Sequence, residues 1–316
     1  MGSRPVLRDF SDDDVARVRA LADAVEAATG IEPLGDDAWT GMHAMAGRDR
    51  GVFDKSGDAY AHLARHHDHE WSIELVARPD ASVDLDALLT DALAVIAGDG
   101  GGHVTYWVHG TECDPAADAR ATDAGFVAER DLLQLRVPLP LPHSIRDAAR
   151  WPADTTVRTF RVGDDEAAWV PVNNRAFAGH PEQGAWTVEM LQAREEEDWF
   201  DPEGFVLAFD AASDGGQLAG FCWTKVHSAH PPREPEALGE IYVIGADPSR
   251  HGRGLGRALT TAGLESLASR GITVGMLYVD ADNEAAVGLY RALGFVTHRT
   301  DRAYGREVDV DVDAAS

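Results

Sequence analysis

The stretch from residue 240 to residue 259 reads EIYVIGADPSRHGRGLGRAL and decides the fold of its half of the chain. Residues 240–246 are mostly β-branched or aromatic, which predicts a strand. Asp247 and Pro248 follow directly and predict the end of that strand. Residues 257–269 then carry apolar side chains at helical spacing, which predicts a helix. The order is therefore strand, glycine-rich turn and helix.

The turn between this strand and this helix predicts an anion site. It holds three glycines and three arginines: Gly252, Gly254, Gly256, Arg250, Arg253 and Arg257. The first N–H groups of a helix have no partner inside the helix, and the helix dipole adds partial positive charge there. Guanidinium groups add full charges. A diphosphate is the anion that such a turn fits best.

Two common nucleotide motifs are excluded by the spacing of the glycines. A phosphate-binding P-loop ends in Gly-Lys-Ser/Thr, and no lysine follows these glycines. A dinucleotide fingerprint needs Gly-x-Gly-x-x-Gly, whereas the glycines here alternate at positions 252, 254 and 256.

The chain reads as two copies of one α/β unit. Strand-like and helix-like patterns near residues 6–28 return at 157–177, and a strand at 103–108 returns at 275–279. Each copy has a short helix that ends in Gly-Phe. The order is kept in both copies, which indicates a repeat. The proline-rich segment 138–142 predicts a linker, so we expect domains at 1–141 and 152–316.

Charge and composition limit the partners. The 316 residues include 28 Lys and Arg against 54 Asp and Glu, a net charge of −26. Such a surface repels nucleic acid and anionic lipid, so neither is expected to bind. Apolar runs stop short of the roughly 20 residues that span a bilayer, and the first residues lack a secretory pattern. Cys113 and Cys222 are expected to be buried thiols in a reducing cytoplasm.

Together with the turn, residues 283–295, NEAAVGLYRALGF, carry a family resemblance. Residues 152–308 resemble the Gcn5-related N-acetyltransferases. The resemblance implies an α/β fold of two tandem acetyltransferase domains, each a mixed, mostly antiparallel sheet flanked by helices. It also implies acetyl-CoA as the co-substrate, with its pyrophosphate on the turn. His251 stands where the family pattern has Gln or Arg, and Arg250 is expected to compensate.

Four segments resemble the mycothiol synthases, a tandem subfamily: HPEQGAW (180–186), FCWTKVH (221–227), EIYVIG (240–245) and LYVDADN (277–283). The resemblance implies that acetyl moves to the cysteinyl amine of Cys-GlcN-inositol and forms mycothiol, the last step of its biosynthesis. The partner is then a small thiol-sugar, and we expect a monomer without a metal. The implied substrate contacts are Asp36, Glu182, Lys225, Glu240 and Tyr278.

The resemblance also implies which residues contact acetyl-CoA. They form three groups in the second half: the strand end, the turn, and the start of a later helix. The strand end contributes Ile244, Gly245 and Ala246. The turn contributes His251, Gly252, Arg253, Gly254, Leu255, Gly256 and Arg257. The helix start contributes Asn283, Glu284, Ala285, Ala286, Val287 and Gly288.

Direct acetyl transfer needs a base for the amine, a donor for the thioester carbonyl and an acid for the leaving sulfur. We assign Glu240 to the amine and Tyr290 to the CoA sulfur. A strand N–H near residues 243–245 is expected to polarise the carbonyl. The alternatives are an edge carboxylate facing solvent for Glu240 and a packed aromatic ring for Tyr290.

The first half lacks the counterpart of this chemistry. Its equivalent of the turn has no glycine and places Asp84 and Asp86 where a diphosphate would bind. Ala121 stands where Tyr290 stands in the second half. We therefore expect the first half not to catalyse. The resemblance implies weaker CoA binding there, through the strand backbone of Leu75, Val76 and Ala77.

Other readings of the sequence stay open. The second half could acetylate another small-molecule or peptide amine, or the chain could bind CoA without catalysis. Asp36 could simply cap a helix. Irregularly spaced histidines are expected to lie on the surface rather than to bind metal: His43, His62, His66, His67 and His69.

Overall fold

The structure is a computed structural model. It describes residues 5–43, 48–66, 69–110, 114–178, 183–211, 216–228 and 236–311. The chain forms two compact units. The first comprises residues 1–133, 280–282 and 298–316, and the second comprises residues 134–279 and 283–297. Each unit combines segments that are separate in the sequence. The expected domains 1–141 and 152–316 are continuous ranges, and they stay a prediction.

The first unit contains a mixed sheet in the order β1-β2-β3-β4-β5-β12. Its strands are β1 (Val6–Leu7), β2 (Arg50–Phe53), β3 (Ala59–Arg65), β4 (Glu70–Ala77), β5 (Gly102–Gly110) and most of β12 (Val296–Val308). Its helices are α1 (Asp12–Thr29), α2 (Asp36–His43), α3 (Leu85–Gly98) and α4 (Pro115–Asp123). Neighbouring strands are antiparallel except β4 and β5, which are parallel.

The second unit repeats this plan. Its strands are β7 (Thr155–Thr159), β8 (Phe205–Asp210), β9 (Gln217–His227), β10 (Leu238–Ala246), β11 (Val274–Asp280) and the end of β6 (Val127–Pro138). Its helices are α5 (His143–Ala148), α6 (Glu166–Ala176), α7 (Val188–Glu195), α8 (Leu255–Ser269) and α9 (Glu284–Ala292), with short 3₁₀ turns η1 (Pro202–Gly204) and η2 (Pro248–Arg250). Only β10 and β11 are parallel among the pairs of this sheet with a described register.

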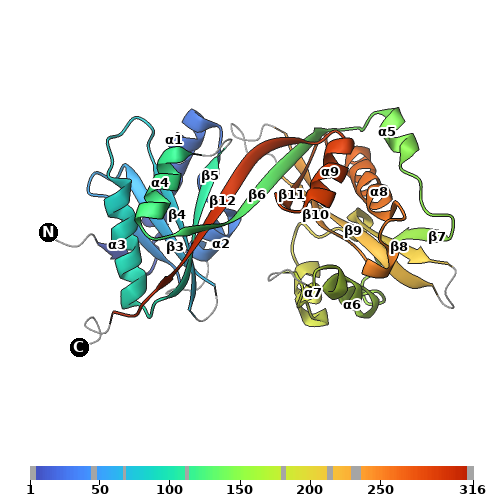
Figure 1. Ribbon diagram of the computed structural model, residues 1–316, viewed down its shortest axis with the longest axis horizontal. Coiled ribbons are helices and arrows are strands. Elements are labelled where there is room, and N and C mark those ends of the chain that lie inside the picture. Colours follow the sequence, from blue (N-terminus) through green and yellow to red (C-terminus); the bar gives the residue numbers. More distant parts are fainter. Residues whose placement is uncertain are drawn as a thin grey trace. The chain divides into compact units, whose positions relative to one another are not determined.

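The expected fold class is confirmed in each unit: mixed, mostly antiparallel sheets flanked by helices (Figure 1). The predicted strand and helix around the glycine turn are β10 and α8, and α8 begins two residues earlier than the helix expected from residue 257. The predicted repeat is also visible in the element order, because strand, helix, strand and short helix run as β4-α3-β5-α4 and again as β10-α8-β11-α9.

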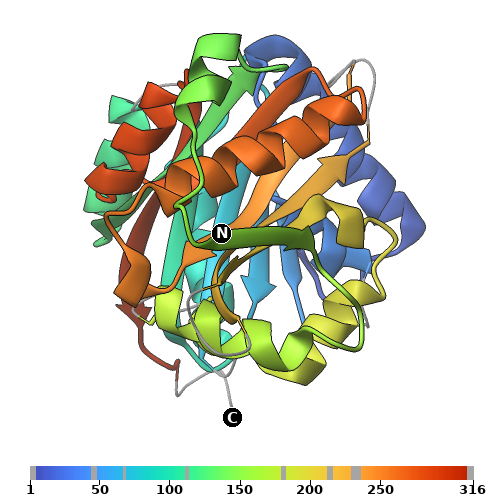
Figure 2. The same ribbon diagram turned by 90° about the vertical axis from the view of Figure 1, so that its right-hand side faces the viewer.

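Helices cover both faces of the sheet in the second unit (Figure 2). On one face α8 packs so closely that a Cβ added at Gly263 would lie 2.5 Å from Cys222 Sγ. On the other face Trp169 of α6 packs against Trp223 of β9, with ring centroids 6.2 Å apart. Since side chains alternate along a strand, Cys222 and Trp223 point to opposite faces. The cores on both faces fix the strands that carry the site.

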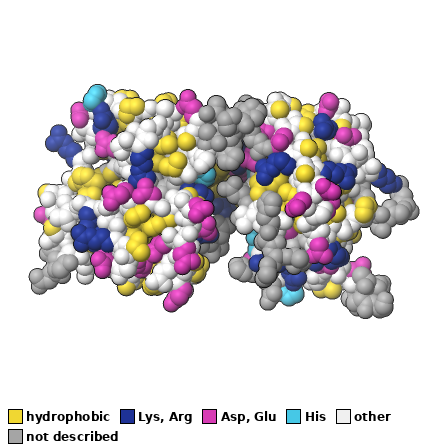
Figure 3. Space-filling model, turned by 180° about the vertical axis from the view of Figure 1, so that it is seen from behind, with side chains coloured by type: hydrophobic (Ala, Val, Ile, Leu, Met, Phe, Trp, Pro, Cys, Tyr) yellow, Lys and Arg dark blue, Asp and Glu magenta, His cyan; other side chains and the backbone are white. Residues whose placement is uncertain are grey.

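The surface shows no large single-sign patch on the face seen in Figure 3, where acidic and basic side chains are interspersed. Within the described ranges, every helix is too short or too polar to cross a bilayer. The expectation of a buried thiol is confirmed for Cys222, whereas Cys113 lies outside the described residues.

Candidate active site

The two parallel strands of the second unit separate after a short pairing. Leu238, Gly239 and Glu240 pair with residues 274–276 of β11, and the rest of β10 lies beyond this pairing. On its other edge β10 stays paired with β9 up to Ala246, with a register shift between Ile241 and Val243. One edge of β10 therefore presents backbone groups away from β11 over residues 241–246, where the carbonyl donor was expected.

The turn after β10 is built by its own side chains. The Asp247 carboxylate accepts hydrogen bonds from the Ser249 N–H (3.0 Å) and from the Arg175 guanidinium (2.7 Å). These bonds lower the pKa of Asp247 to about 2, against the opposing effect of burial. The His251 ring lies 3.2 Å from the carbonyl oxygen of Ala246. The Asp-Pro signal thus marks a turn that holds its shape through bonds to the charged carboxylate.

The glycines allow the backbone to enter α8. Gly252 and Gly254 have φ values of +76° and +82°, in the left-handed region that favours glycine. Gly254 is the N-cap of α8 and supplies no side chain to bond the first N–H groups. The first N–H groups of α8 thus have no side-chain cap, and the anion site expected there stays a prediction.

One arginine of the turn is already engaged. Arg250 forms an ion pair with Asp210 of β8, so its charge is partly neutralised within the protein. Arg253 is exposed and Arg257 is half-buried. Arg250 therefore also ties the turn to a neighbouring strand, and the expectation that the three arginines serve an anion stays a prediction.

The first unit confirms the contrast expected from its sequence. Its equivalent helix, α3, is capped by Asp84, whose side chain accepts a hydrogen bond from the Ala87 N–H at 2.9 Å. Asp86 pairs with Arg120. A carboxylate thus caps the helix of the first unit, where the second unit has a glycine without a side-chain cap. Leu75, Val76 and Ala77 lie beyond the parallel pairing of β4 with β5, which ends at Glu74.

Glu240 lies in the interior of the sheet. It pairs with Lys225 on β9 and with Met276 on β11, and only 8% of its surface is exposed. The alternative of an edge carboxylate facing solvent is therefore wrong. Its Oε2 atom lies 2.7 Å from His227 Nε2, a contact that the sequence reading did not anticipate. The register of β9 against β10 could have indicated it, but that register is set by tertiary pairing.

Lys225 is held by aromatic rings. Its Nζ atom lies 4.9 Å from the centroid of the Trp199 ring and 5.7 Å from that of Tyr242. A cation over an aromatic face is attracted by the ring quadrupole. The ammonium therefore has a defined position on the same face of the sheet as Glu240. Trp186 and Trp223 are buried in the core of the unit, as expected.

Tyr290 is a buried phenol on α9. It is 7% exposed, and its ring packs against Phe295 with centroids 5.7 Å apart. Burial raises the pKa of Tyr290, so the phenol keeps its proton at neutral pH. The Phe295 N–H bonds the Tyr290 carbonyl at 3.1 Å, and the Phe126 N–H bonds the Ala121 carbonyl at 2.9 Å. This shared geometry places Ala121 at the Tyr290 position of the first half.

The start of α9 and Tyr278 complete the description of the expected site residues in the second unit. Asn283 caps α9 by accepting a hydrogen bond from the Ala286 N–H at 3.2 Å, and the residues 284–288 form its first turns. A Cβ added at Gly256, the second residue of α8, would lie 3.5 Å from the Leu289 side chain, so the start of α8 contacts the second half of α9. Tyr278 is 37% exposed, and its hydroxyl accepts a hydrogen bond from Gln134 at 2.7 Å.

Two expected substrate residues cannot be placed. Glu182 lies outside the described residues. Asp36 is the first residue of α2, and only its backbone is described.

Among the histidines, His62 contradicts the expected surface location, because it is buried between Tyr60 and Asp49. Within the described ranges no group of three or more His, Cys, Asp or Glu side chains is arranged to hold a metal ion.

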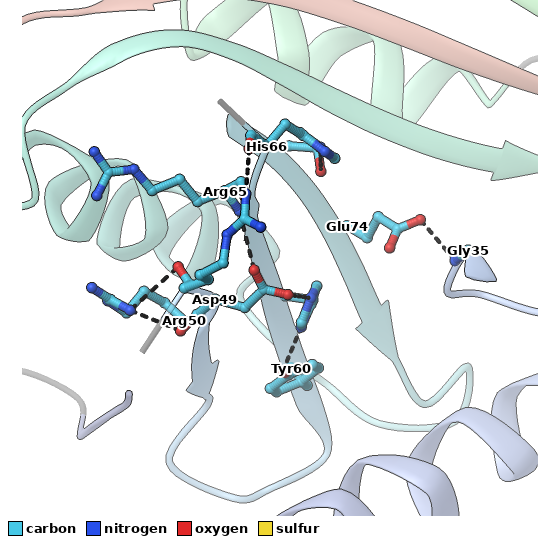
Figure 4. A network of polar contacts seen from close by, with 10 residues as sticks. Gly35, Asp49, Arg50, Tyr60, Arg65, His66 and Glu74 are labelled. Carbon is cyan, nitrogen blue, oxygen red and sulfur yellow. Dashed lines mark hydrogen bonds and ion pairs between the residues drawn. The ribbon is translucent and has the colours of Figure 1, made fainter. Parts of the chain in front are cut away.

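The first unit fills the position of Glu240 with a closed polar cluster. Glu74, the last parallel-paired residue of β4, accepts hydrogen bonds from the Gly35 N–H (2.9 Å) and from His109 Nε2 (2.8 Å). Figure 4 shows its carboxylate directed at Gly35. His109 Nδ1 in turn lies 2.8 Å from Asp301. These buried groups satisfy one another.

The comparisons with known proteins agree with this geometry. The model of the acetyltransferase (GNAT) family matches residues 172–295. A GCN5-related N-acetyltransferase from Sphaerobacter thermophilus shares the fold with a TM-score of 0.74 and 22% identity, over 98% of each chain. A tandem GNAT protein from the clavulanic acid biosynthesis pathway has a TM-score of 0.67 and 19% identity, over 97% of this chain and 98% of the other. The fold and the open turn thus define a tandem N-acetyltransferase.

Sequence relatives narrow this class. The mycothiol acetyltransferase of Acidimicrobium ferrooxidans is 44% identical over 90% of this chain and 91% of its own. That of Thermomonospora curvata is 42% identical over 93% and 94%, respectively. The chain belongs to the mycothiol acetyltransferase family, an acetyl-CoA-using branch of the GNAT enzymes.

A negative charge introduced at Gly254 provides a test of the anion site. A Cβ at this position would meet no atom within 4 Å, so an added side chain acts through charge and backbone strain and not through a clash. We expect Gly254→Asp to weaken acetyl-CoA binding at least tenfold, about 1.4 kcal/mol, because the carboxylate caps α8 and repels the diphosphate. Gly254→Asn, which has the same shape without the charge, is the control. Equal affinities of the two variants in calorimetric titration would contradict the prediction.

His109 provides a test of the first-unit cluster. Its bonds to Asp301 and Glu74 outweigh burial and raise its pKa to about 9 from the usual 6.5. The stabilisation is complete below about pH 6.5 and is lost as the pH rises through 9. We expect the unfolding free energy from denaturant titration to fall over this window, by an amount on the order of 3 kcal/mol. His109→Gln should be less stable and nearly insensitive to pH there, while exposed His103→Gln should keep the wild-type slope.

Proposed function

We propose that the second half transfers acetyl from acetyl-CoA to the cysteinyl amine of Cys-GlcN-inositol and so forms mycothiol. The observation that carries the proposal is a single arrangement: the open edge of β10 leads into an uncapped helix N-terminus, and the same strand carries the buried carboxylate of Glu240. The names of the relatives support the acceptor.

Acetyl-CoA is proposed to lie along the open edge and the turn. The N–H groups at the start of α8, with Arg253 and Arg257, would hold the pyrophosphate. The strand end Ile244–Ala246 would pair with the pantetheine amides, and the first turns of α9 would border the thioester. No metal is required by this chemistry, because backbone donors and guanidinium groups supply the positive charge.

The proposed reaction is direct transfer. Glu240 accepts a proton from the cysteinyl ammonium, and the neutral amine attacks the thioester carbonyl to form the C–N bond. A β10 backbone N–H donates a hydrogen bond to the developing oxyanion. The C–S bond breaks, and the protonated phenol of Tyr290 donates its proton to the leaving CoA thiolate. The phenol is reprotonated from the second proton that the amine loses.

The acceptor is proposed to contact Lys225, Tyr278 and Glu182 of the second half. Ammonium, phenol and carboxylate groups suit the many hydroxyls of a pseudo-disaccharide. The defined position of Lys225 over Trp199 and Tyr242 supports this role for the lysine. The closed cluster around Glu74 supports the proposal that the first half does not catalyse and binds CoA only weakly, through Leu75–Ala77.

The wider setting is proposed from the same features. We place the enzyme in the cytoplasm as a monomer whose partners are small molecules. The net charge of −26 disfavours binding to nucleic acid or to anionic membranes.

The acceptor can be tested directly. We expect the purified protein to acetylate Cys-GlcN-inositol with a kcat/KM at least about 100-fold above that for cysteine-terminated peptides, since several hydroxyl contacts add to recognition. Product should be quantified by mass spectrometry, because the acceptor thiol interferes with thiol-reactive detection of CoA. Equal rates on peptides would contradict the acceptor, and turnover of no amine would contradict the enzyme.

Tyr290→Phe tests the acid. We expect kcat to fall at least about tenfold with the acetyl-CoA dissociation constant unchanged within about twofold, because the variant loses only the proton donor. Calorimetry and steady-state kinetics would measure the two quantities. Tyr106→Phe, which alters a buried tyrosine of the first unit, is the control and should keep wild-type kcat. A matched loss of binding and turnover in Tyr290→Phe would identify a packing role instead.

A further inference from the structure

His227 is bonded to the proposed base. It is the last residue of β9, and it lies opposite Leu238, two residues before Glu240 on β10. His227 Nε2 lies 2.7 Å from Glu240 Oε2, with side chains 27% and 10% exposed. The pair is thus a short, partly buried contact between neighbouring strands. Rigid strands hold both of its members.

The register places this pair on the face that also carries Lys225. Directly paired residues of antiparallel strands share a face, so Glu240 and Lys225 lie together. His227 is two residues from Lys225 on the same strand and therefore points to the same face. The contact with His227 uses Oε2 of Glu240.

The first unit has no equivalent of this histidine. In its register Glu74 pairs with His62 as Glu240 pairs with Lys225, and Ser72 pairs with Ala64 as Leu238 pairs with His227. Ala64 is the residue at the His227 position. The histidine that bonds Glu74 comes instead from β5 and is also held by Asp301. The arrangement of Glu240 with a β9 histidine is therefore specific to the half that is proposed to catalyse.

We propose that His227 is a positioning residue that orients Glu240 for proton transfer. Its ring N–H donates to Oε2, which limits the rotation of the carboxylate. The carboxylate is the group that accepts a proton from the acceptor ammonium in the proposed reaction. His227 itself touches no reacting atom. The inference rests on the proposed function, because it presumes that Glu240 is the base.

Variants of His227 separate positioning from structure. His227→Leu removes the donor, His227→Asn shortens it, and His227→Gln places an amide N–H near the position of Nε2. We expect kcat to fall about 10- to 100-fold in the Leu and Asn variants and to return to within about threefold of wild type in Gln. The acetyl-CoA dissociation constant should stay within about twofold. His103→Leu, which removes an exposed histidine bonded to Glu307, is the control.

Wild-type kcat in both His227→Leu and His227→Asn would overturn the inference, and so would a kcat of His227→Gln as low as that of His227→Leu.

Glu240→Gln distinguishes failure of the inference from failure of the proposed function. If Glu240→Gln keeps its turnover, the assignment of the base is wrong, and the inference falls with it. If Glu240→Gln loses turnover while His227→Asn keeps it, only the inference is wrong. If both lose turnover and the double variant His227→Asn/Glu240→Gln is no slower than Glu240→Gln, the two residues act as one unit.

Discussion

The site depends on the separation of two parallel strands. β10 and β11 pair over three residues and then part, while β10 remains attached to β9. A sheet that continued its ladder would satisfy the backbone groups of residues 241–246 internally and leave no edge for a ligand. Because the cores on both faces hold β9 and β10 in place, the open edge is kept without a partner strand. Glu240 lies on the same strand, and the glycine turn and α8 follow it in the chain.

The two halves share one backbone arrangement but carry different side chains at equivalent positions. In both, the parallel pairing ends at a glutamate and a helix begins beyond the strand. In the first half the helix is capped by Asp84, and Glu74 is bonded by His109 and Gly35. In the second half the helix has a glycine cap, and Glu240 meets only a strand-end histidine among the contacts described here. The two halves therefore differ in their side chains. In the first half these side chains bond one another and cap the helix, whereas in the second half the first N–H groups of α8 have no side-chain cap.

The turn of the second unit carries a cluster of arginines although the chain as a whole is strongly acidic. The chain carries −26 overall, yet the turn keeps Arg253 and Arg257 beside uncapped N–H groups. Arg175 and Arg250 are used differently, since they bond Asp247 and Asp210 and so hold the turn to the rest of the unit. Positive charge thus helps to shape the turn, and Arg253 and Arg257 are the charges that the proposed function assigns to the ligand.

The sequence by itself determined the strand–turn–helix order, the repeat and the helix start without a side-chain cap, because these follow from local patterns of β-branched residues, glycines and helix starts. It also indicated the contrast between Asp84 and Gly254 and between Ala121 and Tyr290. Tertiary structure alone decided that Glu240 is interior and bonded to His227, that Arg250 is paired, that His62 is buried, and that His109 bridges Glu74 and Asp301. These facts depend on strand register and on pairings between distant residues, which local sequence does not encode.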